Sequence, residues 1–548
     1  MKGIIGHIEF KDKILYQDKG LGCLVIQDVN YKTQLSLSMK STLYGYGAGE
    51  FASCAGEIVY VNDGGLWRDG RCIAKGIFGD LVSGDHCVWG ILVKDQICQL
   101  FQYKVKTNQL VFSQRPAWLL ASNIVLHPKN QNKIAFIEWD RRLMPWDQSH
   151  VVIWDGEQTL LKNPYGENIQ QVAWVDADTL VMIAQVGNWW NLVLYHFQDN
   201  LWRILITRPY DCLVPLWGRG QRTMGVFERK VTFCEQQDGQ HLLYTFDIDQ
   251  ETLMPVSCPF THVQELRVAS NGQLLVKGGD PWHDMALWSD KDHFITPYDR
   301  LMPYFNLRKI GDDVIAWLYE VKDHRAIVIS SHGGPAGQHA LVGDAGVAKL
   351  LNHKISFCAL DYRGSTGRGA EFRNCIYGKW GQVDVDDCVN LIGLIQSIFP
   401  KLPIFLKGNS AGAMTCLLAA ARVRVDGVFM RYPVLNISAL LEHNSLFEGN
   451  YLSRLLPAEV LALDLVDSAI KCECPFLIQQ GDEDEIVHAA QVEIVVRKIM
   501  EKGGQVQYVL HRGEGHGFRS PTVSDCAQSH ELAFIHQWSQ KACRHTTE

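Results

Sequence analysis

The sequence lacks several features that would place it in a specialised class of protein. No run of eighteen apolar residues occurs, and residues 1–8 lead into charged side chains instead of a sustained apolar segment, so neither a membrane span nor a secretory signal is expected. The net charge is −8, without the basic excess of a nucleic-acid binder. The 16 cysteines form no paired C-x-x-C modules, which favours reduced thiols over a zinc site or a disulfide framework. These absences predict a cytoplasmic protein without membrane or nucleic-acid partners.

The first part of the chain, residues 1–298, is predicted to be an all-β propeller. It lacks long amphipathic helical patterns and consists of short runs rich in Val, Ile, Leu, Trp and Tyr, separated by Gly, Asp and Asn. Loosely similar segments follow one another at a spacing of about 40 residues, as four-stranded propeller blades require. About seven such units can be parsed, at residues 3–37, 50–78, 82–114, 118–163, 169–208, 212–258 and 261–298. A pair of β-sandwiches is the alternative, but sandwiches do not usually repeat at this period.

The pattern changes beyond residue 299, and residues 299–548 are predicted to form an α/β domain. Apolar runs alternate there with helical patterns, which indicates a mostly parallel sheet with helices on both faces. The expected strands are residues 314–320, 326–331, 355–360, 404–407, 427–431, 476–480 and 505–510, and the clearest helices are residues 384–397, 489–502 and 529–541. Active groups in such a sheet collect at the carboxyl ends of the strands.

The stretch Gly408-Asn409-Ser410-Ala411-Gly412 is the strongest local signal in this domain. It lies between an apolar strand and a helix of small residues and leucines, which is the order of a nucleophile elbow. Glycine on both sides avoids collisions with the neighbouring strand and helix, and the turn exposes the Ser410 hydroxyl. The amino end of the helix is then directed at any oxyanion formed beside the serine. An ordinary glycine-rich turn is the alternative.

Three further motifs follow strands of the same predicted sheet. His332-Gly-Gly-Pro follows residues 326–331, and a glycine N–H in this loop can donate to an oxyanion together with the N–H of Ala411. Four acidic residues, 482–485, follow the strand at 476–480, and a glycine-flanked histidine, His516, follows the last strand. Each has an ordinary alternative, namely a Gly-Pro turn, a solvated acidic loop and a surface histidine. Their order along the chain, serine then acid then histidine, is nevertheless the order of an α/β-hydrolase.

Together these motifs resemble the prolyl oligopeptidase family of serine peptidases, in particular its acylaminoacyl-peptidase and dipeptidyl-peptidase-like bacterial branch. The resemblance is carried by residues 332–335, 361–372, 378–387, 408–412 and 513–518, and in the first domain by residues 44–51, 139–147, 187–192 and 215–217. It therefore covers nearly the whole chain. The family pattern G-x-x-D-x-x-V falls on Gly481, Asp484 and Val487, which selects Asp484 over Asp482.

The sequence departs from the family pattern at a few positions. Ala413 stands where many members have glycine, Gln480 replaces a frequent histidine, and His488 replaces a proline. None of these is a position of the expected triad. The first blade begins close to residue 1, which leaves open how the propeller closes.

The resemblance implies a serine hydrolase in which Ser410 attacks the substrate carbonyl, His516 transfers the proton and Asp484 fixes the imidazole tautomer. The N–H groups of Gly334 and Ala411 are then expected to stabilise the oxyanion, and no metal or cofactor is required. A stretch resembling the family's pocket wall contains Phe447 and Tyr451, which are four residues apart and are expected to share one helix face. Packing of these two rings in a helix core is the alternative.

The expected substrates are short peptides, because in the family the propeller covers the strand ends of the hydrolase domain. An esterase or amidase acting on small acyl compounds is an alternative with the same chemistry. A propeller interaction module with an idle hydrolase domain is a third reading, which the intact triad motifs disfavour. No confident Glu-Glu pair for a substrate amine is present, so dipeptidyl-peptidase specificity is unsupported, and the sequence does not predict the oligomeric state.

Overall fold

The computed structural model divides into two compact units. Unit 1 comprises Met1–Asp280, Met285–Tyr298 and Ser445–Tyr451, and unit 2 comprises Pro281–Asp284, Asp299–Asn444 and Leu452–Glu548. The structure describes residues 5–545 except residues 11–13, 19–22, 28–31, 36, 38, 40, 42, 44–48, 63, 114–115, 117, 214–216, 218–219, 312–313, 443–445 and 449. Parts of three motifs noted in the sequence, residues 44–48, 215–216 and 449, lie outside the described residues.

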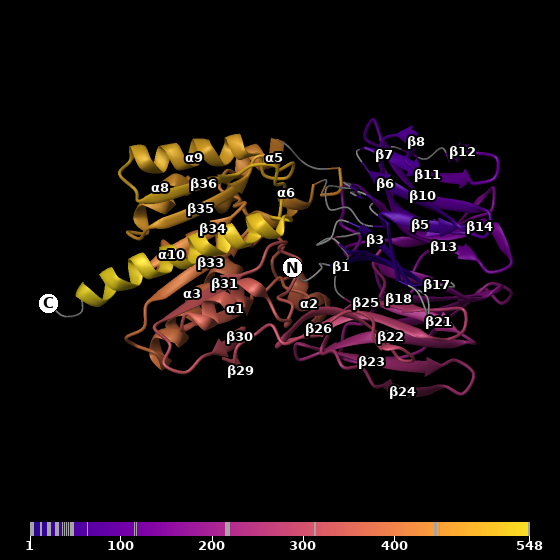
Figure 1. Ribbon diagram of the computed structural model, residues 1–548, viewed down its shortest axis with the longest axis horizontal. Coiled ribbons are helices and arrows are strands. Elements are labelled where there is room, and N and C mark those ends of the chain that lie inside the picture. Colours follow the sequence, from indigo (N-terminus) through magenta and orange to yellow (C-terminus); the bar gives the residue numbers. More distant parts are fainter. Residues whose placement is uncertain are drawn as a thin grey trace. The chain divides into compact units, whose positions relative to one another are not determined.

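Unit 1 is a seven-bladed β-propeller (Figure 1). Within the described residues it has seven four-stranded antiparallel sheets, each built from four strands that are consecutive in the chain, so the predicted propeller is confirmed. The first three blades are β1 (Ile5–Phe10), β2 (Ile14–Asp18), β3 (Cys23–Gln27), β4 (Lys32–Leu35); β5 (Phe51–Cys54), β6 (Glu57–Asn62), β7 (Gly65–Arg68), β8 (Arg71–Lys75); and β9 (Ile77–Ser83), β10 (Cys87–Lys94), β11 (Ile97–Lys104), β12 (Gln109–Phe112). The other four are β13 (Leu119–His127), β14 (Asn130–Asp140), β15 (His150–Trp154), β16 (Gln158–Leu161); β17 (Ile169–Asp176), β18 (Thr179–Val186), β19 (Trp189–His196), β20 (Leu201–Ile204); β21 (Met224–Phe227), β22 (Lys230–Gln237), β23 (Gln240–Asp247), β24 (Thr252–Val256); and β25 (His262–Val268), β26 (Leu274–Asp280), β27 (His283–Ser289), β28 (His293–Phe294).

The fifth blade shows how local sequence forms these sheets. Val186 of β18 pairs with Trp189 of β19 across a two-residue turn whose first residue, Gly187, has φ of 60°. Asn200, between β19 and β20, has φ of 50°. Glycine and asparagine adopt this left-handed conformation more readily than other residues, and such turns match the twist of antiparallel strands. The turn residues therefore fix the register, and the apolar runs between them fill the spaces between blades.

The ring closes by packing of side chains between its first and last blades. Tyr16 and Val25 of the first blade form one buried apolar cluster with Leu275 and Leu287 of the last blade. All four side chains are at most 1% exposed. Because every blade uses consecutive strands, apolar burial between these two blades takes the place of a strand exchanged between them.

Unit 2 contains an eight-stranded sheet in the order β29-β30-β32-β31-β33-β34-β35-β36. The first pairings, β29 with β30 and β30 with β32, are antiparallel, and the pairings from β32 to β36 are parallel. The strands are β29 (Asn306–Ile310), β30 (Ile315–Glu320), β31 (Ala326–Ser331), β32 (Ile355–Asp361), β33 (Ile404–Asn409), β34 (Gly427–Arg431), β35 (Phe476–Gly481) and β36 (Val506–His511). The mostly parallel sheet is confirmed, and β29 is a strand that the sequence pattern did not predict.

Helices cover both faces of this sheet (Figure 1). Helices α1 and α10 contact each other and share one buried core with Val328, Phe357 and Phe405 of the central strands. Helices α3, α4, α8 and α9 form a second contiguous layer. The helices are α1 (Ala345–Asn352), α2 (Gly369–Asn374), α3 (Val383–Ile398), α4 (Ala411–Ala420), α5 (Ile437–Glu442), α6 (Tyr451–Leu455), α7 (Ala458–Leu461), α8 (Leu465–Lys471), α9 (Ala489–Glu501) and α10 (Pro521–His545). Burial on both faces explains why the central strands read as continuous apolar runs.

Candidate active site

Ser410 lies at the sharp turn between strand β33 and helix α4. Its backbone has φ of 51° and ψ of −119°, a conformation that costs a non-glycine residue on the order of 1–3 kcal/mol and is concentrated at functional sites. A Cβ atom on Gly408 would lie 2.4 Å from Cα of Ala413, and one on Gly412 would lie 2.3 Å from the carbonyl oxygen of Ser331. The backbone therefore leaves room only for glycine on both sides of the serine, as in a nucleophile elbow.

His516 lies in the loop after strand β36 and reaches Ser410. Its Nε2 atom is 3.0 Å from Ser410 Oγ. The nearby residues Gly513 and Gly517 have φ of 74° and 94°, a region that glycine occupies without strain. The imidazole is thus within hydrogen-bond reach of the hydroxyl proton, as a general base must be.

Asp484 is the acidic residue that contacts this histidine. Its Oδ2 and Oδ1 atoms lie 2.9 Å and 3.2 Å from His516 Nδ1. The carboxylate is buried, and Oδ1 accepts the backbone N–H groups of Ile486 and Val487 at 2.9 Å and 2.8 Å. Asp482 instead is exposed and accepts a backbone N–H of the histidine loop at 2.7 Å. The structure therefore brings Asp484 to the imidazole and leaves Asp482 outside this contact.

Gln480 is a site residue whose role the sequence did not reveal. Its side-chain amide is fully buried and donates to Asp484 Oδ2 at 3.0 Å and to the carbonyl of Val487 at 2.8 Å. It therefore holds both the carboxylate and the loop that carries it. The signals in the sequence were the two consecutive glutamines at the end of strand β35 and the replacement of a frequent family histidine at position 480.

Tyr432 is a second residue that sequence reasoning missed. It follows strand β34 with φ of 38°, and its ring centroid lies 4.7 Å from that of His516 and 5.4 Å from that of Phe518. Burial raises the pKa of the Tyr432 phenol, so the ring packs against the imidazole in its neutral form. The contact restricts the orientation of His516 from the side that its two hydrogen bonds leave open.

The residues expected to bind an oxyanion lie next to the elbow. Ala411 is the first residue of α4, where backbone N–H groups lack partners within the helix and the helix dipole is positive. On the other loop, a Cβ atom on Gly333 would lie 3.3 Å from Cβ of Ser410, and Gly334 follows with φ of 124°. The backbone of Gly333 and Gly334 and the amino end of α4 are therefore both close to Ser410.

A buried charge cluster lies beneath this site. Glu531 of α10 accepts hydrogen bonds from Lys407 of β33 at 3.2 Å and from Arg431 of β34 at 2.5 Å. Burial raises the pKa of Glu531, but the two cations outweigh it, so the pKa lies below the ordinary value. The cluster ties α10 to the two strands that end at Ser410 and Tyr432.

The two expected pocket residues, Phe447 and Tyr451, lie in the segment that belongs to unit 1. Their rings are almost completely buried and pack against three tryptophans of that unit, with centroid distances of 5.9–6.4 Å. The tryptophans are Trp139, Trp146 and Trp217. Phe447 precedes α6, and Tyr451 is its first residue, so the two rings do not share a helix face as expected. Their role in a substrate pocket stays a prediction.

Two features of the described residues concern other classes of site. No group of three or more His, Cys, Asp or Glu side chains in this part of the chain is placed to hold a metal ion. No described helix is long and apolar enough to cross a membrane. The cysteines that the structure describes are free thiols, most of them buried, and cytoplasmic location stays a prediction of the sequence.

The second unit is an α/β-hydrolase fold in which a serine, a histidine and a buried aspartate are in hydrogen-bond contact. Residues 346–542 match the model of the prolyl oligopeptidase family. This region is therefore a prolyl oligopeptidase family domain, the family that the motifs of the sequence resemble.

Individual relatives and solved structures are also similar to this chain. The chain is 27% identical over 215 residues to dipeptidyl aminopeptidase BIII of Pseudoxanthomonas mexicana and 22% identical over 364 residues to the acylamino-acid-releasing enzyme of Arabidopsis thaliana. These matches cover 36% and 59% of this chain but 30% and 46% of the relatives, so the chain spans less than half the length of either. A puromycin-hydrolyzing peptidase from Mycobacterium tuberculosis superposes with a TM-score of 0.86 over 98% of this chain and 94% of its own, at 18% identity. That last likeness shows the fold.

Proposed function

We propose that the protein is a serine peptidase that hydrolyses short peptides through an acyl-enzyme on Ser410. The observation that carries the proposal is the unbroken series of hydrogen bonds from Ser410 Oγ to His516 Nε2 at 3.0 Å and from His516 Nδ1 to Asp484 at 2.9 Å. The strained elbow supports it, because such strain persists where function requires it. Relatives named as a dipeptidyl aminopeptidase and an acylamino-acid-releasing enzyme support peptides as the substrate class.

The proposed reaction has two halves. Ser410 Oγ attacks the scissile carbonyl carbon while His516 Nε2 takes the hydroxyl proton, and the buried Asp484 carboxylate stabilises the imidazolium that results. The imidazolium then gives this proton to the leaving amine, the C–N bond breaks, and the acyl group stays on Ser410. Water, deprotonated by the same imidazole, attacks the ester carbon. The ester C–O bond then breaks, the acyl group leaves as a carboxylic acid, and the proton on His516 returns to Ser410 Oγ. The chemistry requires no cofactor.

Two backbone groups are proposed to stabilise the tetrahedral oxyanion. The N–H of Ala411 and the N–H of Gly334 belong to segments beside Ser410, and removal of one such donor typically costs about 3 kcal/mol of transition-state stabilisation. The acyl-side pocket is proposed to prefer apolar or aromatic residues, on the resemblance that assigns Phe447 and Tyr451 to its wall. Activity restricted to acidic or basic residues at that position would rule out this preference.

Probe labelling tests the proposal directly. A fluorophosphonate probe is expected to label the wild type at Ser410, and Ser410→Ala is expected to abolish labelling and to lower turnover of an acetylated dipeptide amide by several orders of magnitude. Ser397→Ala is the matched control, because Ser397 is exposed on α3 and its hydroxyl donates to the carbonyl of Leu394 in the same helix. Absence of labelling in folded wild-type protein would favour the idle propeller module.

A panel of substrates separates the peptidase from its alternatives. N-acetylated, free-amine and blocked dipeptides should be compared with the matching esters and with puromycin, which the name of one structural neighbour suggests. Hydrolysis of small esters with no measurable cleavage of peptide amides would favour an esterase. Comparison of a dipeptide reporter, a mid-length peptide and casein tests the expected preference for short chains, because comparable rates on casein would contradict it.

A further inference from the structure

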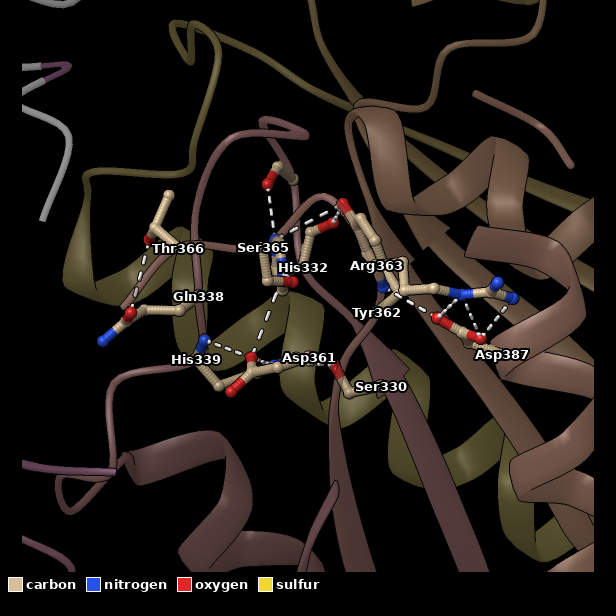
Figure 2. Close-up of polar contacts among 11 residues, drawn as sticks. Ser330, His332, Gln338, His339, Asp361, Tyr362, Arg363, Ser365, Thr366 and Asp387 are labelled. Carbon is tan, nitrogen blue, oxygen red and sulfur yellow. Dashed lines mark hydrogen bonds and ion pairs between the residues drawn. The ribbon is translucent and has the colours of Figure 1, made fainter. Parts of the chain in front are cut away.

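A buried polar network around His332 contacts the loop that carries Gly333 and Gly334 (Figure 2). It joins two loops that follow adjacent parallel strands, the loop after β31 and the loop after β32. The first loop contributes His332, and the second contributes Tyr362 and Ser365, which are all buried. The second loop is part of the Asp361-Tyr-Arg-Gly-Ser motif, to which the proposed reaction gives no role.

Each ring nitrogen of His332 makes one short hydrogen bond, and the Tyr362 hydroxyl lies 3.4 Å from Nδ1. Nδ1 lies 2.7 Å from the carbonyl oxygen of Gly333, and Nε2 lies 2.7 Å from Oγ of Ser365. Tyr362 stacks on the imidazole at a centroid distance of 4.4 Å and donates its hydroxyl to the His332 carbonyl at 3.0 Å. Burial, aided by the nearby His339, lowers the pKa of His332 to about 4, so the ring is neutral at neutral pH and carries a single N–H.

The partners decide which nitrogen carries that proton. A carbonyl oxygen can only accept, so the short contact with Gly333 requires N–H on Nδ1. Nε2 is then an acceptor, and the Ser365 hydroxyl must donate to it. The opposite tautomer has a competing partner, because Asp361 Oδ1 lies 3.9 Å from Nε2. A hydroxyl can donate or accept, so the Gly333 carbonyl selects the tautomer, and the Ser365 hydroxyl satisfies the buried Nε2 atom of that tautomer.

The hydrogen bond to the Gly333 carbonyl also sets the direction of the next N–H. Gly333 and Gly334 are joined by a trans peptide bond, in which the C=O and the following N–H point in opposite directions from one rigid plane. Holding the Gly333 oxygen toward His332 turns the Gly334 N–H away from it. Both residues lack a Cβ, so little else in this peptide unit restricts its rotation.

The second loop is itself fixed to the helical layer. Arg363 donates to Asp387 of α3 through its side chain at 2.9 Å and through its backbone N–H at 2.7 Å (Figure 2). The backbone N–H of Thr366 donates to the Gly337 carbonyl at 2.8 Å, which ties the same loop to the far end of the first one. Ser365 is therefore presented to His332 by a segment that is held at both ends.

We infer that His332 and Ser365 are positioning residues for the proposed reaction. The Ser365 hydroxyl satisfies Nε2 of the His332 ring whose Nδ1–H holds the Gly333 carbonyl, and this hydrogen bond orients the Gly334 N–H toward the oxyanion that forms beside Ser410. The inference rests on the proposed function, since it assigns the support of one proposed oxyanion donor.

The test is Ser365→Ala, compared with Ser356→Ala as the matched control. Ser356 is also fully buried and also bonds a histidine ring nitrogen at 2.7 Å, that of His324, but at the opposite end of strand β32. Loss of one oxyanion donor lowers kcat by on the order of 10²–10³, and Ser365→Ala is expected to lower kcat toward this limit. Because the donor acts only in the transition state, kcat and kcat/KM should fall together. A peptide aldehyde, whose adduct with Ser410 carries the same oxygen, should lose affinity by a similar factor. Ser356→Ala should leave all three values near those of the wild type.

A second variant separates the role of Ser365 at Nε2 from packing. His332→Asn places an amide N–H near the former Nδ1 position and has no second ring nitrogen that needs the Ser365 hydroxyl. In this background Ser365→Ala is expected to have little further effect on kcat, so the two substitutions should be strongly non-additive. If Ser365→Ala alone does not fold, His332→Asn compared with His332→Leu tests the same point, and the asparagine variant should retain more activity.

The outcomes distinguish failure of this inference from failure of the proposed function. An active wild type in which Ser365→Ala matches Ser356→Ala in kcat and aldehyde affinity would overturn the positioning role. An equal loss from Ser365→Ala in the His332→Asn background would show that Ser365 acts through another contact. A folded wild type that neither labels with a fluorophosphonate nor hydrolyses any peptide would instead overturn the proposed function.

Discussion

Replacement of Gly412 by alanine is the most demanding test of the elbow geometry. Gly412 is the second residue of α4, and a Cβ atom there would lie 2.3 Å from the carbonyl oxygen of Ser331 and 2.4 Å from that of His332. Ordinary contacts between nonbonded heavy atoms lie at about 3.5–4.0 Å. The helix and the backbone leading to Gly333 must therefore separate by about 1 Å.

This displacement predicts a larger loss of activity than of stability. Overpacking typically costs about 1–3 kcal/mol, and alanine returns up to about 1 kcal/mol of helix propensity over glycine, so unfolding free energy should fall by about 1–2 kcal/mol. For a domain of this size that corresponds to a decrease in Tm of about 2–8 °C. A misplacement of about 1 Å between catalytic groups can cost about 10²-fold in rate, so kcat/KM should fall by at least that factor.

Gly393→Ala provides the matched control for this experiment. Gly393 is also helical and also in unit 2, but it is exposed on α3 and a Cβ atom there would meet nothing within 4 Å. It should therefore keep full activity and gain up to about 1 kcal/mol of stability. Thermal unfolding and kcat/KM on a dipeptide reporter are measured for both variants. Near-wild-type activity in Gly412→Ala would refute the argument that this contact sets the distance between the elbow and the oxyanion loop.

Three further predictions concern other groups. Glu531→Gln leaves two buried cations without their carboxylate and should lower the free energy of unfolding by about 3–5 kcal/mol, measured by denaturant unfolding. Asp525→Asn is the control, because it breaks an exposed ion pair with Lys349, and it should change the free energy of unfolding by at most about 1 kcal/mol. Burial lowers the pKa of His241 in the propeller from 6.5 to about 4. Between pH 6.5 and about 4 the unfolded state therefore binds more protons, so the free energy of unfolding should fall by about 3 kcal/mol as the pH decreases through this range. His241→Asn should flatten this part of the plot of stability against pH, and an unchanged slope would contradict the assignment. Asp484→Asn should lower kcat by about 10⁴-fold while Asp482→Asn stays within a few-fold, and the reverse order would show that the wrong acid was chosen.

The parts of the fold that sequence predicted well are those where one local rule acts without competition. The propeller blades could be predicted from turn residues such as Gly187 and Asn200 and from the apolar runs between them. Strands β31 and β34 have the bounds that the sequence predicted, residues 326–331 and 427–431, because their apolar runs are covered on both faces of the sheet. Strand β29, with the sequence Asn-Leu-Arg-Lys-Ile, lies at the edge and is mostly polar, so no pattern distinguished it from a loop.

The site residues that could be predicted from sequence are likewise those with a local signature. Ser410 and His516 carry glycine signatures that follow from backbone geometry, and geometry can be read from local sequence. Gln480 acts through side-chain hydrogen bonds within its own loop, and Tyr432 acts through a ring contact with His516, which is distant along the chain. Neither contact follows from a local backbone signature. Asp484 is intermediate, because the acidic run marked the loop while only the family pattern selected the residue.

The contact at Gly412 shows why two motifs distant in sequence constrain each other. One proposed oxyanion donor, Ala411, precedes Gly412 on the elbow helix, and the other, Gly334, follows the very carbonyl groups that Gly412 approaches. The atoms that a Cβ would meet belong to the main chain, so no shortening of a neighbouring side chain could relieve the clash. The carbonyl of His332 is in addition held by the Tyr362 hydroxyl at 3.0 Å, which opposes movement of this segment. The relative position of the two donors is thus set by backbone contact and a buried network together. A search for suppressors of Gly412→Ala should accordingly recover reversion to glycine and no side-chain substitution in the His332 loop.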